Sequence, residues 1–406
     1  MSKKTKQLAL VKDSGGDGNN TILPGIPDEI ALLCLARLPS RVQAQTCCVS
    51  LCWKRAMESQ VLFSLRLQLC NLETKLLLCF NYPRLSYEPR NTYSWWIIDQ
   101  LHIRYFPIKY LPCLPLHDPV RPIATASPRE VLLLNKDGNK LCRVDLFRGN
   151  SCPTSAPVML TNREYFASTL LDGYVYAVGG FITHSCRGEP EHMGLSPINR
   201  PRALKSVERL DCTHMLAWES LPDMHHYRGH AAVVVRNGQL YVIGGKSGRD
   251  QIYSGEIWDP DRQEWRFMPE LWPQNIFDSC SARGRVAVVM GHLVAMKEWT
   301  HELMAYEDSS KQWVSVGYLP FVMLDTVLTH PIFSCMLVGQ GEELWVVVQR
   351  NFATDEGYAI IYGRKDTLKE TCILACTPFS QELNWRRLPY VFDASSVLCS
   401  VIQVMV

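Results

Sequence analysis

The sequence predicts two folded parts, a small all-α module of three helices followed by an all-β propeller of six blades. Three observations lead to this prediction. Prolines, capping residues and apolar residues at helical spacing mark residues 21–68. From about residue 71, short β-branched and aromatic runs broken by Gly, Asn and Asp replace that pattern. In this later region an arrangement of strand, turn and glycines recurs, and a repeat of this kind indicates a propeller.

The composition is that of a folded chain with nearly balanced charge. Of its 406 residues, 47% are hydrophobic and 20% are charged, enough to bury a sizeable core. Lys and Arg number 42 against 40 Asp and Glu, which indicates neither nucleic acid nor an anionic membrane surface as a partner. The cationic N-terminus lacks the apolar run of a signal peptide, and apolar runs elsewhere are only strand-length. We therefore expect a soluble protein of the cytoplasm or nucleus that is not secreted.

The cysteines and histidines do not suggest a metal centre. The 16 cysteines are expected to be reduced thiols, and none forms a Cys-x-x-Cys pair. His184, Cys186 and His192 could be imagined as a metal site, but they lie in a Pro/Gly-rich insertion and fit loop residues better. We expect neither a metal nor a cofactor.

The N-terminal module carries helix signals in sequence order. Residues 1–20 have the composition of a flexible tail. Pro27 stands where a helix can begin, acids follow in the first turn, and Pro39 ends the apolar run. Ser40 and Gln43 form a capping-box pattern for a second helix. A third helix is expected to carry Trp53 and to end near Phe63.

This module resembles the F-box. The resemblance rests on Leu23-Pro24, Ile26-Pro27, Ile30, Leu35, Leu38-Pro39, Val49, Trp53 and Phe63. It implies that residues 21–68 bind a Skp-type adaptor, and through it cullin. The residues to which it assigns the adaptor contact are Pro24, Ile26, Pro27, Ile30, Leu35, Leu38, Pro39 and Trp53, with Trp53 partly in the core. A generic three-helix bundle whose apolar residues all face inward is the alternative.

Two segments of the β-rich region align without gaps, Arg163 to Gly180 and Arg228 to Gly245. In each, the arginine precedes a Gly-Gly doublet by 16 residues, and a turn glycine precedes the doublet by 6. Asp172-Gly173 and Asn237-Gly238 are typical of tight hairpins. The repeated unit is therefore strand, hairpin, strand and glycine doublet.

A later mark, Trp-x-x-(Leu/Met)-Pro, recurs at Trp218, Trp265 and Trp385, with a looser copy at Trp313. The prolines that end successive units are 45 to 69 residues apart, and the two longest intervals carry insertions. A repeat near this length built of four strands is typical of a propeller blade.

This repeat resembles kelch, and the helical module and the repeat together resemble the F-box/kelch-repeat proteins of plants. The residues with the kelch roles are Gly179, Gly180, Trp218, Gly244, Gly245, Trp265, Trp313 and Trp385. In the fifth unit Lys297-Glu298 stands in place of the doublet. The propeller is expected to span residues 71–406 and to close by pairing a C-terminal strand, 396–404, into the first blade, because an open edge invites aggregation.

Two sequence patterns typical of enzymes are each missing one required residue. Gly244-Gly245-Lys246-Ser247 lacks the earlier glycine of a phosphate-binding loop, and Arg249 breaks a Gly-x-Ser-x-Gly elbow. We therefore expect a non-enzymatic substrate adaptor of an SCF-type ubiquitin ligase, whose propeller holds an unidentified target protein. A kelch scaffold unrelated to ubiquitin, for example a cytoskeletal one, and a propeller enzyme remain alternatives.

The expected substrate contacts are Arg163, Arg228 and Tyr227. The two arginines precede the inner strands of consecutive blades, and the resemblance to kelch adaptors places such arginines at the mouth of the channel. A guanidinium there suits bidentate capture of a carboxylate or phosphate. Alternatively, each arginine ties blades together through backbone carbonyls.

Overall fold

The computed structural model describes residues 21–38, 42–57, 59–69, 74–82, 92–98, 103–106, 120–127, 130–135, 141–145, 154–182, 202–212, 217–320, 332–352, 368–380, 382–389 and 397–405. Residues 1–20, Pro39, Ser40, His184, Cys186 and His192 therefore lie outside the described residues. The chain divides into two compact units, Met1–Glu73 and Thr74–Met405, with Val406 grouped with the first.

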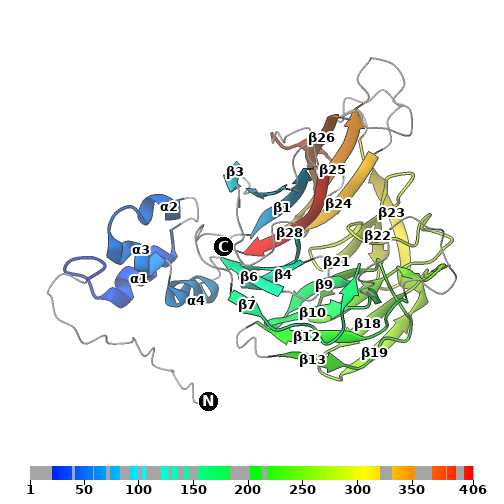
Figure 1. The fold of residues 1–406 in the computed structure, drawn as a ribbon. Helices are drawn as coiled ribbons and strands as arrows, with labels where there is room; N and C mark the ends of the chain where they lie inside the picture. The colour runs from blue at the N-terminus through cyan, green and yellow to red at the C-terminus, as the bar shows by residue number, and fades with distance from the viewer. Residues whose placement is uncertain are drawn as a thin grey trace, which may run out of the picture. The chain divides into compact units, whose positions relative to one another are not determined.

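The first unit is helical (Figure 1). Its described helices are α1 (Asp28–Ala36), α2 (Gln43–Thr46), α3 (Leu51–Met57) and α4 (Gln60–Gln68). Pro27 precedes α1 in an extended conformation, with Asp28 and Glu29 in the first turn as expected. The third predicted helix is instead two helices. The hydroxyl of Ser59 accepts the N–H of Leu62 at 3.1 Å and so caps the start of α4.

The helical unit has its own apolar core. That core consists of Leu32, Leu35, Ala36, Ala56, Met57 and Leu62. The N-terminal segment is tied to α3 because the indole Nε1 of Trp53 donates to the carbonyl of Ile22 at 2.6 Å. Arg66 on α4 is buried and donates to the carbonyl of Leu38, which holds the end of the α1 segment against α4.

The second unit is a β-propeller, and its described strands form six four-stranded antiparallel sheets. In chain order the first three are β28 (Val397–Met405), β1 (Thr74–Tyr82), β2 (Thr92–Ile98), β3 (Ile103–Phe106); β4 (Val120–Ser127), β5 (Glu130–Asn135), β6 (Leu141–Asp145), β7 (Thr154–Ala156); and β9 (Ala167–Leu171), β10 (Tyr174–Val178), β12 (Val207–Asp211), β13 (Trp218–Leu221). The other three are β14 (Ala232–Arg236), β15 (Gln239–Ile243), β18 (Gly255–Asp259), β19 (Glu264–Met268); β20 (Val286–Val289), β21 (His292–Met296), β22 (Glu302–Glu307), β23 (Gln312–Tyr318); and β24 (Ile332–Gln340), β25 (Glu343–Phe352), β26 (Leu368–Cys376), β27 (Arg386–Arg387).

Short elements complete the connections between these strands. Two ribbons of two strands each are β8 (Arg163–Glu164) with β11 (Phe181–Ile182), and β16 (Lys246–Ser247) with β17 (Asp250–Gln251). A 3-10 turn, η2 (Pro269–Leu271), follows β19. The predicted hairpins are confirmed, since Asp172-Gly173 joins β9 to β10 and Asn237-Gly238 joins β14 to β15, each with positive φ at both turn residues.

One edge strand of each four-stranded sheet lies beside the corresponding edge strand of the next sheet. β4 lies beside β9, β9 beside β14, β14 beside β20, β20 beside β24, β24 beside β28, and β28 beside β4. The C-terminal strand β28 pairs antiparallel with β1, so this sheet joins the two ends of the propeller sequence (Figure 1).

Candidate functional site

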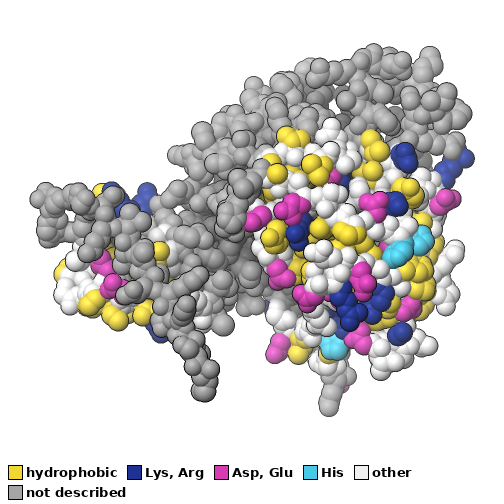
Figure 2. Space-filling view, turned by 90° about the horizontal axis from the view of Figure 1, so that it is seen from below, with side chains coloured by type: hydrophobic (Ala, Val, Ile, Leu, Met, Phe, Trp, Pro, Cys, Tyr) yellow, Lys and Arg dark blue, Asp and Glu magenta, His cyan; other side chains and the backbone are white. Residues whose placement is uncertain are grey.

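The helical unit exposes apolar side chains next to its filled core. Ile26 is 40% exposed and Ile30 on α1 is 50% exposed. Pro24 and Pro27, which precede the helix, are exposed as well. Val49 (61%) and Leu51 (72%), in the turn from α2 to α3, are more exposed still. Figure 2 shows hydrophobic side chains gathered on the surface of this unit. These exposed apolar groups are therefore the candidate partner surface of this unit.

Two of the predicted adaptor contacts face inward. Leu35 is only 2% exposed and belongs to the core of the helical unit, so its predicted contact with the adaptor is wrong. Leu38 is half-buried and packs against the same core. Trp53 is half-buried and bonded to Ile22, which agrees with the core part of the role expected of it. Leu51 was not singled out from the sequence, although its place between Val49 and Trp53 of the F-box pattern could have drawn attention to it.

On the propeller, Arg163 and Arg228 occupy matching buried networks. Arg228 is fully buried and donates from Nη1 to the carbonyls of Gly244 and Ser254 at 2.9 and 3.0 Å. Its Nη2 donates to Ser254 Oγ at 2.8 Å and its Nε to Glu256 Oε1 at 3.0 Å. Arg163 bonds in the same way to Gly179, Ser206 and Glu208.

The partner carboxylates hold the connection that precedes each arginine. Glu256 accepts the backbone N–H groups of His225 and His226 at 2.6 and 3.1 Å. The ring nitrogen Nδ1 of His225 lies 2.9 Å from Glu256 Oε2. Glu208 accepts the N–H groups of Leu160 and Thr161 in the same way. Burial would raise the pKa of Glu256, but Arg228 and the His225 bonds outweigh it and hold that pKa below its ordinary value. Each network therefore fixes an inter-blade connection to its own sheet.

The burial of both arginines contradicts their predicted contact with a substrate. Neither guanidinium is exposed, and the hydrogen bonds described above all go to a carbonyl, a hydroxyl or a carboxylate of the same sheet and its connections. These contacts fit the alternative, in which each arginine has a structural role. They lie within one blade, however, and do not tie two blades together. Tyr227, next to Arg228, is 39% exposed, and the ammonium of Lys205 lies 5.9 Å from its ring centre. Of the three predicted contacts, only Tyr227 is accessible.

The glycine doublets allow close approach between neighbouring blades. A Cβ on Gly179 would lie 2.2 Å from the carbonyl oxygen of Arg228, and a Cβ on Gly244 would lie 2.4 Å from that of Cys280. Both residues have left-handed φ, +60° and +65°. The second glycine of each doublet donates its N–H across the same gap, Gly180 to Arg228 and Gly245 to Cys280, each at 2.8 Å.

Three of the four repeated tryptophans link a blade to the end of the blade before it, whereas Trp385 is half-buried and its indole N–H has no hydrogen-bond partner among the described residues. Trp218 Nε1 donates to the carbonyl of Pro157 at 3.0 Å, and Trp265 Nε1 donates to that of Pro222 at 2.8 Å. Trp313 makes the corresponding bond to Leu271 at 3.1 Å. All three indoles are at most 8% exposed, so the recurrent Trp both fills the gap between blades and satisfies a carbonyl there.

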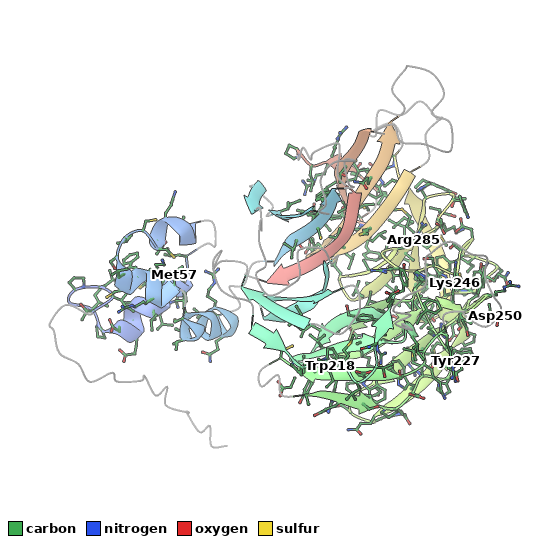
Figure 3. The ribbon with its side chains drawn as sticks, viewed as in Figure 1. Met57, Trp218, Tyr227, Lys246, Asp250 and Arg285 are labelled. Carbon is green, nitrogen blue, oxygen red and sulfur yellow. The ribbon has the colours of Figure 1, made fainter. Side chains whose placement is uncertain are left out.

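The hydrogen bonds of the doublets also place several connections at one end of the propeller. Gly180 bonds to the connection before β14, Gly245 bonds to the connection before β20, and Asp278 in that connection bonds to the β21–β22 loop. We call this the loop face and define it by residues 179–182, 202–206, 222–231, 244–254, 272–285 and 297–301. Figure 3 shows Tyr227, Lys246, Asp250 and Arg285 along one side of the propeller.

The loop face offers aromatic and charged side chains for binding. Lys246 and Asp250 on the β16–β17 ribbon are exposed. Charged side chains of both signs are interspersed on the propeller surface in Figure 2. Trp299, which was not singled out from the sequence, is 73% exposed. It directly follows Lys297-Glu298, the departure from the glycine doublet, and that departure was the signal available in the sequence.

Within the part of the chain that the structure describes, no three His, Cys, Asp or Glu residues are grouped as metal ligands. No helix among the described residues is long and apolar enough to cross a membrane.

Comparison with known proteins agrees with both units of this architecture. A model of the Kelch motif matches residues 227–271. The chain is 23% identical over 384 residues to F-box/kelch-repeat protein At1g16250 of Arabidopsis thaliana, a match that covers 90% of this chain and 92% of that protein. The chain is thus similar, over most of its length, to plant proteins named F-box/kelch-repeat proteins. F-box/kelch-repeat protein SKIP30 of the same plant is 24% identical over 269 residues, which cover 62% of this chain and 67% of SKIP30.

The Kelch match begins at Tyr227 and ends at Leu271. It therefore contains Arg228, the Gly244-Gly245 doublet and Trp265, together with the four strands β14, β15, β18 and β19. Among solved structures, that of YjhT is similar over 68% of this chain and 86% of its own, with a TM-score of 0.43 and 14% identity.

Proposed function

We propose that this chain is the substrate-recognition subunit of an SCF-type ubiquitin ligase. Residues 21–68 bind a Skp-type adaptor, and the propeller, residues 71–406, holds a target protein near the transferred ubiquitin. The chain itself performs no chemistry in this scheme, since partner enzymes transfer the ubiquitin. Tethering raises the effective concentration of the target at the transfer site.

The observation that carries this proposal is the apolar surface of the helical unit. Its core is already filled by residues such as Leu32 and Leu35, yet Ile26 and Ile30 remain 40% and 50% exposed. These side chains cannot be interior groups of an isolated bundle in this fold. They coincide with positions that the F-box resemblance assigns to the adaptor.

We further propose that the six four-stranded sheets are the blades of one closed propeller. The cyclic order of neighbouring strands from β4 to β28 supports this arrangement, and so does the pairing of β28 with β1. Closure removes the exposed edges that an open series of sheets would present. A closed ring is a rigid platform on which to display the loop face.

The proposal is tested by co-purification of a Skp-type adaptor with the full chain. Ile30→Glu should weaken adaptor binding at least about tenfold, because burying an Ile side chain contributes about 1.5–3 kcal/mol and a buried carboxylate adds a further cost. Glu29→Gln, exposed on the same helix, is the matched control and should bind as the wild type does. Titration of purified adaptor by calorimetry gives both affinities.

The variant Leu35→Ala distinguishes a loss of folding from a loss of contact with the adaptor. Leu35 lies in the core, so this variant should lower the stability of the helical unit by about 2–5 kcal/mol. Wild-type adaptor affinity in Ile30→Glu, with the helical unit still folded by circular dichroism, would refute the assignment of α1. Failure of the wild-type chain to bind any Skp-type adaptor would refute the proposed function.

A further inference from the structure

The β21–β22 loop, residues 297–301, presents an unusual tryptophan on the loop face. Trp299 is 73% exposed, whereas Trp258, Trp272 and Trp345 are each 1% exposed. Among the tryptophans whose side chains the structure describes, Trp299 is exposed and the others are buried or half-buried. A large aromatic residue held in water gains much on burial, and Trp is enriched at the energetic centres of protein interfaces.

The backbone that carries Trp299 is braced by the neighbouring connection. Asp278 accepts the N–H of Glu298 with Oδ1 and the N–H of Trp299 with Oδ2, both at 2.9 Å. The segment around Asp278 is itself anchored in the core. There, Trp272 stacks on Phe277 with ring centres 3.6 Å apart, and its Nε1 donates to the carbonyl of Ser279 at 2.9 Å.

The loop also holds a strained residue. His301 has a φ of +55°, in the left-handed region that side chains other than glycine rarely adopt. Such strain costs about 1–3 kcal/mol and is concentrated at binding sites and ligand clamps. The N–H of Leu319 donates to the carbonyl of His301 at 3.1 Å and fixes this conformation from the far end of β23. The loop is therefore ordered before any partner binds, which lowers the entropic cost of binding.

Four charged side chains around Trp299 are paired with one another within the chain. Arg285 Nη2 lies 2.7 Å from Glu298 Oε1, and Lys297 Nζ lies 2.6 Å from Glu302 Oε2. These four side chains are no more than 28% exposed. What the loop itself offers outward is thus the indole, framed by two neutral ion pairs, and the exposed carboxylate of Asp278 beside it accepts two backbone N–H groups. The complementary partner surface is apolar rather than charged.

We propose that Trp299 is the anchor of the target-binding surface and that it packs against apolar side chains of a linear segment of the target protein. This inference rests on the proposed function and names a residue and a ligand chemistry for it. Tyr227, which is 39% exposed in the 222–231 connection, is a second aromatic side chain within the defined loop face.

The test uses a phage-displayed library of random peptides as the probe, panned on the full chain. Enriched peptides are synthesised and titrated against the wild type, Trp299→Ala and Trp299→Phe. We expect peptides with apolar residues at their centre, a loss of affinity of about tenfold or more in Trp299→Ala, and a loss of less than about threefold in Trp299→Phe. Binding should also shield the wild-type indole from acrylamide quenching.

The matched control is Phe379→Ala. Phe379 is 42% exposed and packs at a tilt against His292, the first residue of β21, with ring centres 4.9 Å apart. The Trp299 loop follows the last residue of that strand. This variant removes an exposed aromatic side chain at the other end of the same strand and should bind the peptides as the wild type does. Equal melting temperatures of all variants establish that the fold is retained.

Three results would overturn the proposal: no peptide is enriched, the enriched peptides bind Trp299→Ala as tightly as the wild type, or Trp299 mediates self-association detected by light scattering. Adaptor titration is measured on the same preparations. Adaptor binding without Trp299-dependent peptides refutes the anchor and leaves the ligase role standing. Trp299-dependent peptides without adaptor binding refute the ligase role and leave the anchor standing.

Discussion

Replacing Arg228 by Met should destabilise the propeller by about 3–5 kcal/mol, whether or not a substrate is present. Methionine keeps much of the side-chain volume but removes all four donated hydrogen bonds. The carboxylate of Glu256, itself 0% exposed, would then lack its cationic partner. Removing one member of a buried ion pair leaves an uncompensated charge, and that situation costs about 3–5 kcal/mol.

The same loss of folding stability can be estimated from the individual hydrogen bonds of Arg228. The carbonyl of Gly244 loses its Nη1 donor, and an unsatisfied buried acceptor costs about 1–3 kcal/mol. The carbonyl of Ser254 also loses Nη1 but keeps the N–H of Gly244 at 2.9 Å. Glu256 keeps the N–H groups of His225 and His226, which limits the penalty at the carboxylate. The two routes therefore agree on a loss of several kcal/mol.

The assay is urea unfolding of the full chain, followed by tryptophan fluorescence. Arg262→Ala is the control, because Arg262 is 74% exposed and its ion pairs contribute little. In the double variant with Glu256→Gln, the combined loss should fall short of the sum of the single losses by about 0.5–3 kcal/mol, since the residues act together. An Arg228→Met protein within about 1 kcal/mol of the wild type, yet unable to hold a target, would refute this reasoning and restore a recognition role.

Other features of the propeller lead to three further predictions. The pKa of Glu256 is depressed in the folded state. Its contribution to the free energy of unfolding is therefore present above the unfolded pKa of about 4.3 and is lost as pH falls below that value. Glu256→Gln should flatten the acid side of the plot of stability against pH. Gly244→Ala should cost at least about 2 kcal/mol more than Gly248→Ala by urea unfolding, since both have left-handed φ but only Gly244 faces a carbonyl at 2.4 Å. Deleting residues 394–406 should cause aggregation, measured by light scattering, because β1 loses the partner strand at its edge.

Each of these predictions has a result that contradicts it. Parallel acid profiles for Glu256→Gln and the wild type would mean that the Glu256 carboxylate is not stabilised by folding. Equal losses for Gly244→Ala and Gly248→Ala would show that the neighbouring carbonyl yields without cost. A monomeric truncated chain with the wild-type melting temperature would show that β28 is dispensable for closing the propeller.

Local features of this protein could be predicted from the order of its residues alone. The hairpins at Asp172-Gly173 and Asn237-Gly238 form as predicted, because turn residues carry their backbone preference within a few positions. The start of α1 after Pro27 could be predicted for the same reason. The spacing of the motifs was enough to predict the similarity to F-box/kelch-repeat proteins. The boundary between α3 and α4 was missed, although Ser59 supplied a capping signal.

The direction in which each candidate site residue faces depends on tertiary packing. Arg228 pairs with Glu256, 28 residues further on, and Arg163 pairs with Glu208, 45 residues further on, so their burial depends on strands that meet only in the folded sheet. Leu35 and Ile30 carry similar apolar side chains on one helix, yet only packing against the other helices buries the first and leaves the second exposed. The exposed Trp299 is held by Asp278, which reaches its backbone from a separate connection. Side-chain burial is a property of contacts between distant segments, and a linear pattern does not specify those contacts.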